Sequence, residues 1–135
     1  MARAAAVTVR WRDGLVFEGG PAGRPAITVD GDSKEAISPV ELLLVSAAAC
    51  MAADVVVILK KMRVELARVE LAVHGTRRDA EPRCYTAIDF RWTIAGAGAD
   101  ETKARRAIDL SLEKYCSVMA SLAPNIAVSH DCTLA

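Results

Sequence analysis

The chain has 135 residues, of which 53% are hydrophobic and 25% are charged. This composition excludes intrinsic disorder and allows one domain with its own core. Lys and Arg together number 17, as do Asp and Glu, so the formal net charge is zero. Without a net positive charge, and with only 4% aromatic residues, the chain is not expected to bind nucleic acid.

Three short strands are predicted ahead of the first helix. Apolar and polar side chains alternate from Val7 to Arg12, which indicates a half-buried strand. Asp13-Gly14 is a typical hairpin turn, after which Leu15–Glu18 runs back as the second strand. Ala26–Val29 is the third strand, and residues 31–37 are expected to form a loop.

A long helix is predicted to begin after Ser38 and to end at about Arg63. Ser38 is a favourable N-cap, and Pro39 suits the first helical position. Glu41 follows Ser38 by three residues, the spacing of a capping box in which the carboxylate returns to the N–H of the cap residue. The cap alone therefore accounts for Glu41 without a catalytic role.

This helix is apolar on every side. Between Leu42 and Leu59 the polar side chains are Ser46 and Asp54, and a helix of this kind is usually buried. Its length is near the minimum for a membrane span, but the ionisable Asp54 inside it argues against one, so no membrane association is expected. The helix extends about 36 Å, roughly the width of a domain of this size. A second copy of the chain is therefore expected to cover the side that its own strands leave open.

Strands and one more helix are predicted for the rest of the chain. Val64–His74 is a strand whose apolar phase slips near its fourth residue, which indicates a bulge. Ile88–Ile94 alternates strictly, as a strand does. Helical spacing runs over residues 101–122, and the last strand is Ile126–Leu134. Without a repeat or a linker, the sequence predicts one α+β domain over residues 1–135.

The four cysteines are Cys50, Cys84, Cys116 and Cys132. They contain no Cys-x-x-Cys pair, so a zinc ribbon and a thioredoxin-type motif are excluded, and no four-ligand metal site is expected. The N-terminal residues lack the apolar stretch of a secretory signal. We therefore expect a cytoplasmic protein whose thiols are reduced.

Taken alone, the residues leave the roles of these thiols open. Cys50 lies among five alanines in the long helix, where a free cysteine commonly acts as a small apolar side chain. Cys84 is expected to be a bystander, and Cys132 is expected to lie in the core. Asp54 follows Cys50 by one helical turn on the same face, and it is expected to be structural, in an ion pair across a dimer.

Four blocks form a pattern when they are read together: Ser38–Leu43 (SPVELL), Ala48-Ala49-Cys50, Asp54–Lys61 (DVVVILKK) and Glu113–Val118 (EKYCSV). This pattern resembles the OsmC/Ohr family of osmotically inducible and organic-hydroperoxide-resistance proteins, nearest the branch with the Glu-Lys-Tyr-Cys-Ser-Val block. The resemblance covers nearly the whole chain. It implies an α+β fold of antiparallel strands with a long buried central helix, assembled as an intertwined homodimer.

The resemblance also implies thiol-dependent reduction of organic hydroperoxides. Cys50 would be the peroxidatic thiol that becomes a sulfenic acid. Cys116 would be the resolving thiol, and an external dithiol would reduce the resulting Cys50–Cys116 disulfide. An arginine near the N-terminal hairpin would stabilise the thiolate, and either Arg12 or Arg10 fits this role by position.

Glu41 is the candidate active-site acid by the same resemblance. In the better-known peroxidases this acid precedes the first cysteine by ten residues, whereas Glu41 precedes Cys50 by nine. Nine residues on a continuous helix turn about 900° and advance about 13.5 Å. Glu41 is therefore expected not to touch Cys50 of its own helix, and a catalytic role would require the second subunit.

Two other functions are compatible with these residues. One is a dimer that binds a small apolar or electrophilic ligand at its interface without chemistry, and the other is a structural dimer whose thiols belong to the core. Titration of thiols after addition of an organic hydroperoxide separates them. Only a peroxidase would lose two thiols per chain and gain an intramolecular disulfide.

Overall fold

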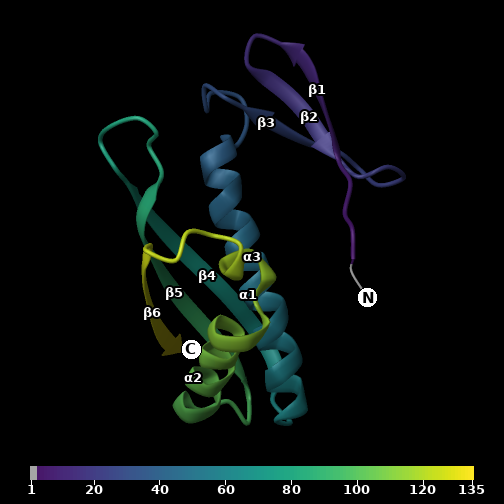
Figure 1. The fold of residues 1–135 in the computed structure, drawn as a ribbon. Coiled ribbons are helices and arrows are strands. Elements are labelled where there is room, and N and C mark those ends of the chain that lie inside the picture. The colour runs from purple at the N-terminus through teal and green to yellow at the C-terminus, as the bar shows by residue number, and fades with distance from the viewer. Residues whose placement is uncertain (1–2) are drawn as a thin grey trace. The chain divides into compact units, whose positions relative to one another are not determined.

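The computed structural model describes residues 3–135, and Figure 1 shows the elements in chain order. The mixed α+β class that the sequence predicts is confirmed. The chain forms two compact units, a first that ends at Leu43 and a second that spans Leu44–Ala135. The expectation of a single domain stays a prediction, and the two units are described separately.

The first unit contains a meander of three antiparallel strands, β1 (Thr8–Asp13), β2 (Val16–Gly20) and β3 (Ile27–Asp30). The predicted hairpin turn is present, and Gly14 adopts a positive φ of 51° that suits glycine. The indole Nε1 of Trp11 donates a hydrogen bond to the carbonyl oxygen of Gly14 at 2.8 Å. The turn chemistry of the sequence therefore fixes this hairpin.

A buried carboxylate organises the loop after β3. Asp30 is only 2% exposed and accepts hydrogen bonds from the backbone N–H groups of Asp32, Lys34 and Glu35 at 2.8, 3.1 and 3.0 Å. These backbone hydrogen bonds, that of Glu35 above all, hold the pKa of Asp30 below its ordinary value. The loop that leads into the first helix is thus folded around one charged group.

Helix α1 (Pro39–Lys61) begins and ends close to the predicted positions. At its C-terminus Arg63 adopts a positive φ of 64°. The N–H of Arg63 donates to the carbonyl of Lys60, and that of Val64 donates to the carbonyl of Leu59. This pair of bonds is a Schellman motif, and it ends the helix without the glycine that usually occupies such a position.

Within one chain α1 buries one side rather than all of its surface. Its buried residues recur every fourth position: Ala47, Met51, Val55 and Leu59. A second row with the same spacing, Val45, Ala49, Ala53 and Val57, is exposed. Val45 and Val57 are 50% and 52% exposed. We call this second row the exposed apolar row.

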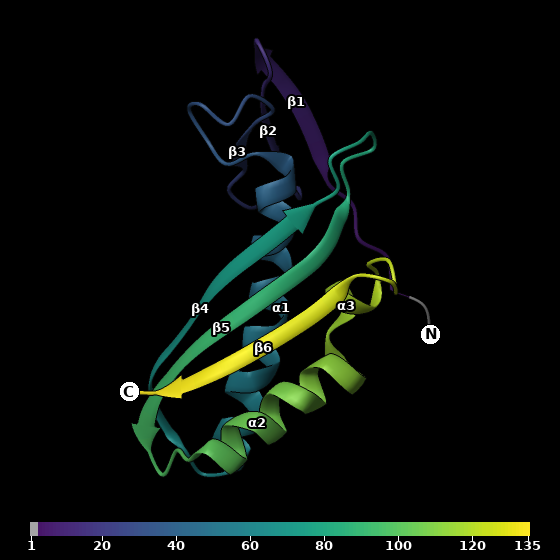
Figure 2. The same ribbon diagram turned by 90° about the vertical axis from the view of Figure 1, so that its left-hand side faces the viewer.

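The second unit contains a three-stranded sheet, in which β5 (Tyr85–Ala97) lies between β4 (Glu65–Arg77) and β6 (Ala127–Leu134). β4 and β5 are antiparallel, and the predicted bulge is confirmed as a register shift between Leu66 and Arg68. β6 instead runs parallel to β5, as the arrows in Figure 2 show. The expectation of antiparallel strands is therefore corrected for this one pair.

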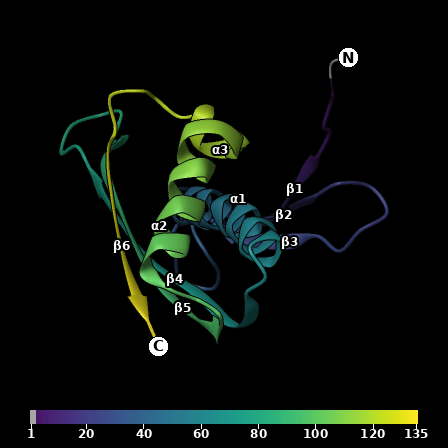
Figure 3. The same ribbon diagram turned by 90° about the horizontal axis from the view of Figure 1, so that it is seen from below.

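Helices α1 and α2 (Glu101–Leu110) cover the same face of this sheet, as Figure 3 shows from below. The face carries alternate residues of β5, which include the two largest fully buried side chains, Trp92 and Phe90. The buried residues of β5 and α2 are Tyr85, Ile88, Phe90, Trp92, Ile94, Ala104, Ala107 and Ile108. The apolar side chains that recur every second residue in β5 and at helical spacing in α2 thus form one apolar layer.

The helix predicted over residues 101–122 is broken in the structure. α2 ends at Leu110, the chain continues as a π-helical turn η1 (Ser111–Tyr115), and a short helix α3 (Ser117–Ala120) follows. Cys116 separates η1 from α3 in an extended conformation, with φ −73° and ψ 102°. Apolar spacing continues across the break, which is why the sequence pattern did not reveal it.

Candidate active site

Cys50 and Cys116 lie together in the second unit. Cys50 is half-buried in α1, Cys116 is buried at the junction of η1 and α3, and both are free thiols. Their side chains lie within hydrogen-bonding reach of each other. The structure therefore brings together the two cysteines that the sequence analysis paired, although 65 residues lie between them (51–115).

The backbone around Cys116 positions its thiol. The N–H of Cys116 donates to the carbonyl oxygen of Ser111 at 2.8 Å, a bond that spans five residues and defines a π-helical turn. The thiol itself accepts a hydrogen bond from the N–H of Met119 at 3.5 Å. Cys116 is thus held by hydrogen bonds both at its backbone and at its sulfur.

Burial is the main influence on the acidity of Cys116. The pKa of this thiol is raised to about 11, above all by loss of solvent and also by the nearby Cys50 thiol, while the N–H groups of Met119 and Val118 oppose the shift. A thiol in this environment keeps its proton at neutral pH. Cys116 is therefore a poor nucleophile toward an incoming molecule.

Asp54 follows Cys50 by one turn of α1 and accepts a hydrogen bond from a hydroxyl group. The Oγ atom of Ser111 donates to Oδ2 of Asp54 at 2.9 Å, and Ser111 is fully buried. The sequence analysis expected Asp54 to be ion-paired across a dimer. The structure shows a neutral donor from the same chain, contributed by the turn that precedes Cys116.

The other two cysteines, Cys84 and Cys132, belong to other elements of the fold than Cys50 and Cys116. Cys84 is exposed just before β5. Cys132 is half-buried on β6, where burial raises the pKa of its thiol. His130, on the same strand, has Nε2 3.6 Å from Oδ1 of Asp109.

Arg12 and Glu41 belong to the first unit, and each is engaged there. Arg12 donates to Oε2 of Glu35 at 2.9 Å, and Arg10 is exposed on the same strand. Oε1 of Glu41 accepts hydrogen bonds from the backbone N–H of Ser38 at 3.0 Å and from its hydroxyl at 2.7 Å. The predicted capping box is confirmed.

The hydroxyl of Ser33 adds a third hydrogen bond to Oε1 of Glu41, at 2.9 Å. The side chain of Ser38, the backbone of Ser38 and then Ser33 hold the pKa of Glu41 below its ordinary value. Glu41 is therefore an ionised acceptor with a local structural role. A general acid would require the opposite shift.

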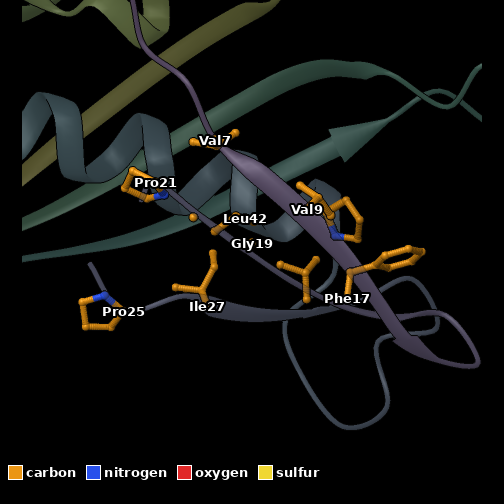
Figure 4. Close-up of a pocket in the computed structure, with 11 residues that line it drawn as sticks. Val7, Val9, Phe17, Gly19, Pro21, Pro25, Ile27 and Leu42 are labelled. Atoms are coloured by element: carbon orange, nitrogen blue, oxygen red, sulfur yellow. The ribbon is translucent and has the colours of Figure 1, made fainter. Parts of the chain in front are cut away.

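An apolar groove of about 550 Å³ lies on the sheet of the first unit, and Figure 4 shows its side chains. The paired positions Val9, Gly19 and Ile27 form one row across the three strands. A Cβ atom at Gly19 would lie 3.3 Å from Cγ2 of Val9, so glycine keeps this part of the groove open. The sequence patterns do not predict the groove, although the apolar alternation of β1 contributes to its lining.

No cluster of three or more His, Cys, Asp or Glu side chains that could hold a metal ion occurs within residues 3–135. Helix α1 is long and apolar enough to cross a membrane by length and composition, with a mean hydropathy of 2.5 over its best window. Length and composition do not separate a membrane span from a helix at an interface. The expectation of no membrane association stays a prediction.

Two features of this chain have known counterparts: a long helix with one thiol near a second thiol in a broken helix, and an antiparallel meander in a unit of its own. The family model described as "OsmC-like protein" matches residues 31–131. The chain therefore belongs to the OsmC family.

Particular relatives extend this result. The chain is 38% identical over 123 residues to Protein YhfA of Escherichia coli strain K12, covering 90% of this chain and 92% of the relative. It shares its fold with the OsmC-like protein of Mycoplasma pneumoniae, at a TM-score of 0.85 and 18% identity over 99% of both chains. It also shares its fold with the organic hydroperoxide resistance protein OhrB of Bacillus subtilis, at a TM-score of 0.64 and 17% identity over 97% of this chain and 98% of that one.

Proposed function

We propose that this protein is a thiol-dependent peroxidase that reduces organic hydroperoxides. The observation that carries the proposal is that the free thiols of Cys50 and Cys116 lie within hydrogen-bonding reach of each other. Two thiols that lie this near each other in the reduced protein need little movement to form a disulfide. The fold shared with an organic hydroperoxide resistance protein of Bacillus subtilis supports the same chemistry.

The proposed reaction has two steps within the protein. The Cys50 thiolate attacks one oxygen of the O–O bond, the alkoxide leaves and takes a proton to become an alcohol, and Cys50 becomes a sulfenic acid. The Cys116 sulfur then attacks the Cys50 sulfur. The S–O bond breaks, the hydroxide takes the proton of Cys116 to form water, and a disulfide remains. An external dithiol returns both residues to thiols.

The surroundings of the two sulfurs support this division of roles. Cys50 is half-buried, whereas Cys116 is 3% exposed, so a peroxide has access to Cys50 first. The raised pKa of Cys116 keeps it protonated at neutral pH. In the proposed reaction Cys50 is therefore the first nucleophile, and Cys116 reacts only in the second step, with the sulfenic acid.

Arg12 is the proposed cation for the Cys50 thiolate, with Arg10 as the alternative. A thiolate is stabilised by a nearby guanidinium, and both arginines lie on β1. No metal, haem or flavin is needed for the reaction, because the two thiols carry the electrons.

A homodimer is proposed as the working form. The exposed apolar row of α1 leaves Val45 and Val57 half exposed, and Ala49 and Ala53 between them would let a second helix approach closely. A row of apolar side chains of this length is covered in most soluble proteins. A second copy of α1 is complementary to this row, because small side chains on both helices allow close packing.

One measurement tests the proposed function directly. The reduced protein is mixed with one equivalent of tert-butyl hydroperoxide, and free thiols are titrated within seconds. The expected result is the loss of two thiols per chain, with a Cys50–Cys116 disulfide in peptide mapping. Retention of all four thiols under these conditions would exclude the peroxidase.

The apolar groove of the first unit favours a second candidate function, the binding of a small apolar molecule without chemistry. Its volume of about 550 Å³ lies within the usual range of small-molecule sites. A fluorescent fatty acid tests this candidate. Saturable binding that is unchanged in Cys50→Ser, in a protein whose thiols resist peroxide, would favour the binder over the peroxidase.

A further inference from the structure

The first residue of the η1 turn, which precedes Cys116, is linked to the helix that holds Cys50. Ser111 donates its hydroxyl to Asp54 on α1 at 2.9 Å. Its carbonyl oxygen accepts the N–H of Cys116 at 2.8 Å. Ser111 is fully buried, so water has little access to its side of these two bonds. One residue therefore connects the element of the first thiol to the backbone of the second.

Both hydrogen bonds of Ser111 lead to positions near the two cysteines along the chain. Asp54 lies one helical turn from Cys50 on the same face of α1. The bond from Ser111 reaches the backbone nitrogen of Cys116 itself. A shift of the η1 turn along α1 would therefore break the Asp54–Ser111 bond and move the Cys116 sulfur away from Cys50.

We propose that Asp54 and Ser111 are a positioning pair that holds Cys116 in register with Cys50 for disulfide formation. The proposal rests on the proposed function for its biological role, since it concerns the second step of that reaction. In that step the Cys116 sulfur attacks the Cys50 sulfenic acid, one S–S bond forms, the S–O bond breaks, and water leaves. Neither member of the pair gains or loses a proton.

The geometry explains why such a pair would matter for the second step and not for the first. Attack on a peroxide requires only Cys50 and its access to solvent. Attack by Cys116 requires two protein sulfurs to approach along one line, and misplacement of a reacting group by about 1 Å can lower a rate by about a hundredfold. Cys116 is buried and extended between two helical segments. Its position therefore depends on how η1 and α3 are held on either side of it.

Three variants separate the hydrogen bond from the charge and from stability. Ser111→Ala removes the donor. Asp54→Leu removes both charge and acceptor while keeping a similar shape in an apolar helix, so this variant is expected to fold. Asp54→Asn removes the charge but keeps an oxygen that accepts from Ser111. The matched control is Ser129→Ala, because the Ser129 hydroxyl also donates to an aspartate, Asp89, at 2.8 Å on the exposed side of the sheet.

Two readouts are measured on each full-length variant. The first is the fate of Cys50 after one equivalent of tert-butyl hydroperoxide, with dimedone present to trap the sulfenic acid. The second is the equilibrium between the dithiol and the Cys50–Cys116 disulfide in glutathione buffers, which requires no peroxide. For Ser111→Ala and Asp54→Leu we expect unchanged oxidation of Cys50, disulfide closure slowed by about tenfold or more, and a lower equilibrium constant for the disulfide.

Asp54→Asn and Ser129→Ala are expected to match the wild type in both readouts. If Ser111→Ala and Asp54→Leu close the disulfide at the wild-type rate and with the wild-type equilibrium constant, the proposal is wrong, even if they unfold at a lower temperature. If peroxide leaves Cys50 of the wild type unreacted, the proposed function fails. The glutathione equilibrium then still decides whether Asp54 and Ser111 position the two thiols.

Discussion

Ser38 and Glu41 hydrogen-bond to each other in both directions. The hydroxyl of Ser38 accepts the N–H of Glu41 at 3.2 Å, and Oε1 of Glu41 accepts the N–H of Ser38 at 3.0 Å. Both partners satisfy backbone donors that the first turn of a helix leaves free. The start of α1 is therefore fixed by two side chains and needs no contact with the thiols.

Substitution of Glu41 should affect stability more than catalysis. Glu41→Gln keeps an oxygen that closes the capping box, so it should retain most of the stability and most of the peroxidase activity. Glu41→Ala should lower the melting temperature by a few degrees, as other lost caps do. Thermal denaturation and peroxide consumption are measured side by side. A Gln variant of normal stability with very low activity would instead assign Glu41 to the active site.

Substitution of the cysteines should separate the two steps of the reaction. Cys50→Ser should abolish peroxide consumption, because Cys50 is the thiol that attacks the peroxide in the proposed reaction. Cys116→Ser should allow one turnover and then accumulate sulfenic acid or overoxidised Cys50, detected by mass spectrometry. Cys84→Ser is the control, since Cys84 is exposed and ahead of β5, and it should turn over normally. Loss of activity in the control with retention in Cys50→Ser would reverse the assignment.

Replacement of Arg12 should slow the first step. Arg12→Gln should lower the rate of Cys50 oxidation by about a hundredfold, the size of effect seen when one stabilising donor is removed from a developing charge. Arg10→Gln, on the same strand, provides the comparison. Stopped-flow measurements at saturating external dithiol report the step. A large effect of Arg10→Gln and none of Arg12→Gln would transfer the role to Arg10.

Acid should weaken the loop that is folded around Asp30. Its pKa in the folded protein is lower than the ordinary value of 3.8, so its stabilising effect is complete above that value and is lost as pH falls through the folded pKa. In Asp30→Asn the free energy of unfolding should be lower at neutral pH, and the gap to wild type should narrow in acid. Denaturant titrations from pH 7 to about 2 measure this. Asp32→Asn, an exposed neighbour, should follow the wild-type curve.

A charge on the exposed apolar row of α1 should dissociate the proposed dimer. Ala53→Arg places a long cation between Val45 and Val57, where a second helix would have to approach. Sedimentation velocity should show a dimer for the wild type and monomer or aggregate for this variant. Ala80→Arg, in an exposed turn, should remain dimeric. A folded wild-type monomer at micromolar concentration would refute the dimer.

The features predicted correctly from the sequence depend on local spacing. Ser38 and Glu41 are three residues apart, and the alternation over Ile88–Ile94 needs no knowledge of a partner strand. The features that were missed depend on distant residues. Alternation of apolar and polar residues is the same in parallel and antiparallel strands, so the sequence of β6 does not predict that it runs parallel to β5. Ser111 and Asp54 meet across the fold, and no local pattern identifies the donor that a helical aspartate will find.

The parallel pairing of β6 with β5 has a consequence for how the thiol pair is assembled. Two parallel neighbours require a crossover connection between them, and here α2, η1 and α3 form that connection, with Cys116 near its end. The crossover is held at both ends only after its last strand has joined the sheet. During synthesis Cys50 emerges from the ribosome long before β6, so the nascent chain carries an unpartnered thiol until its final residues are made. Chains cut short ahead of Ala127 should therefore form mixed disulfides with other thiols in the cell more readily than complete ones.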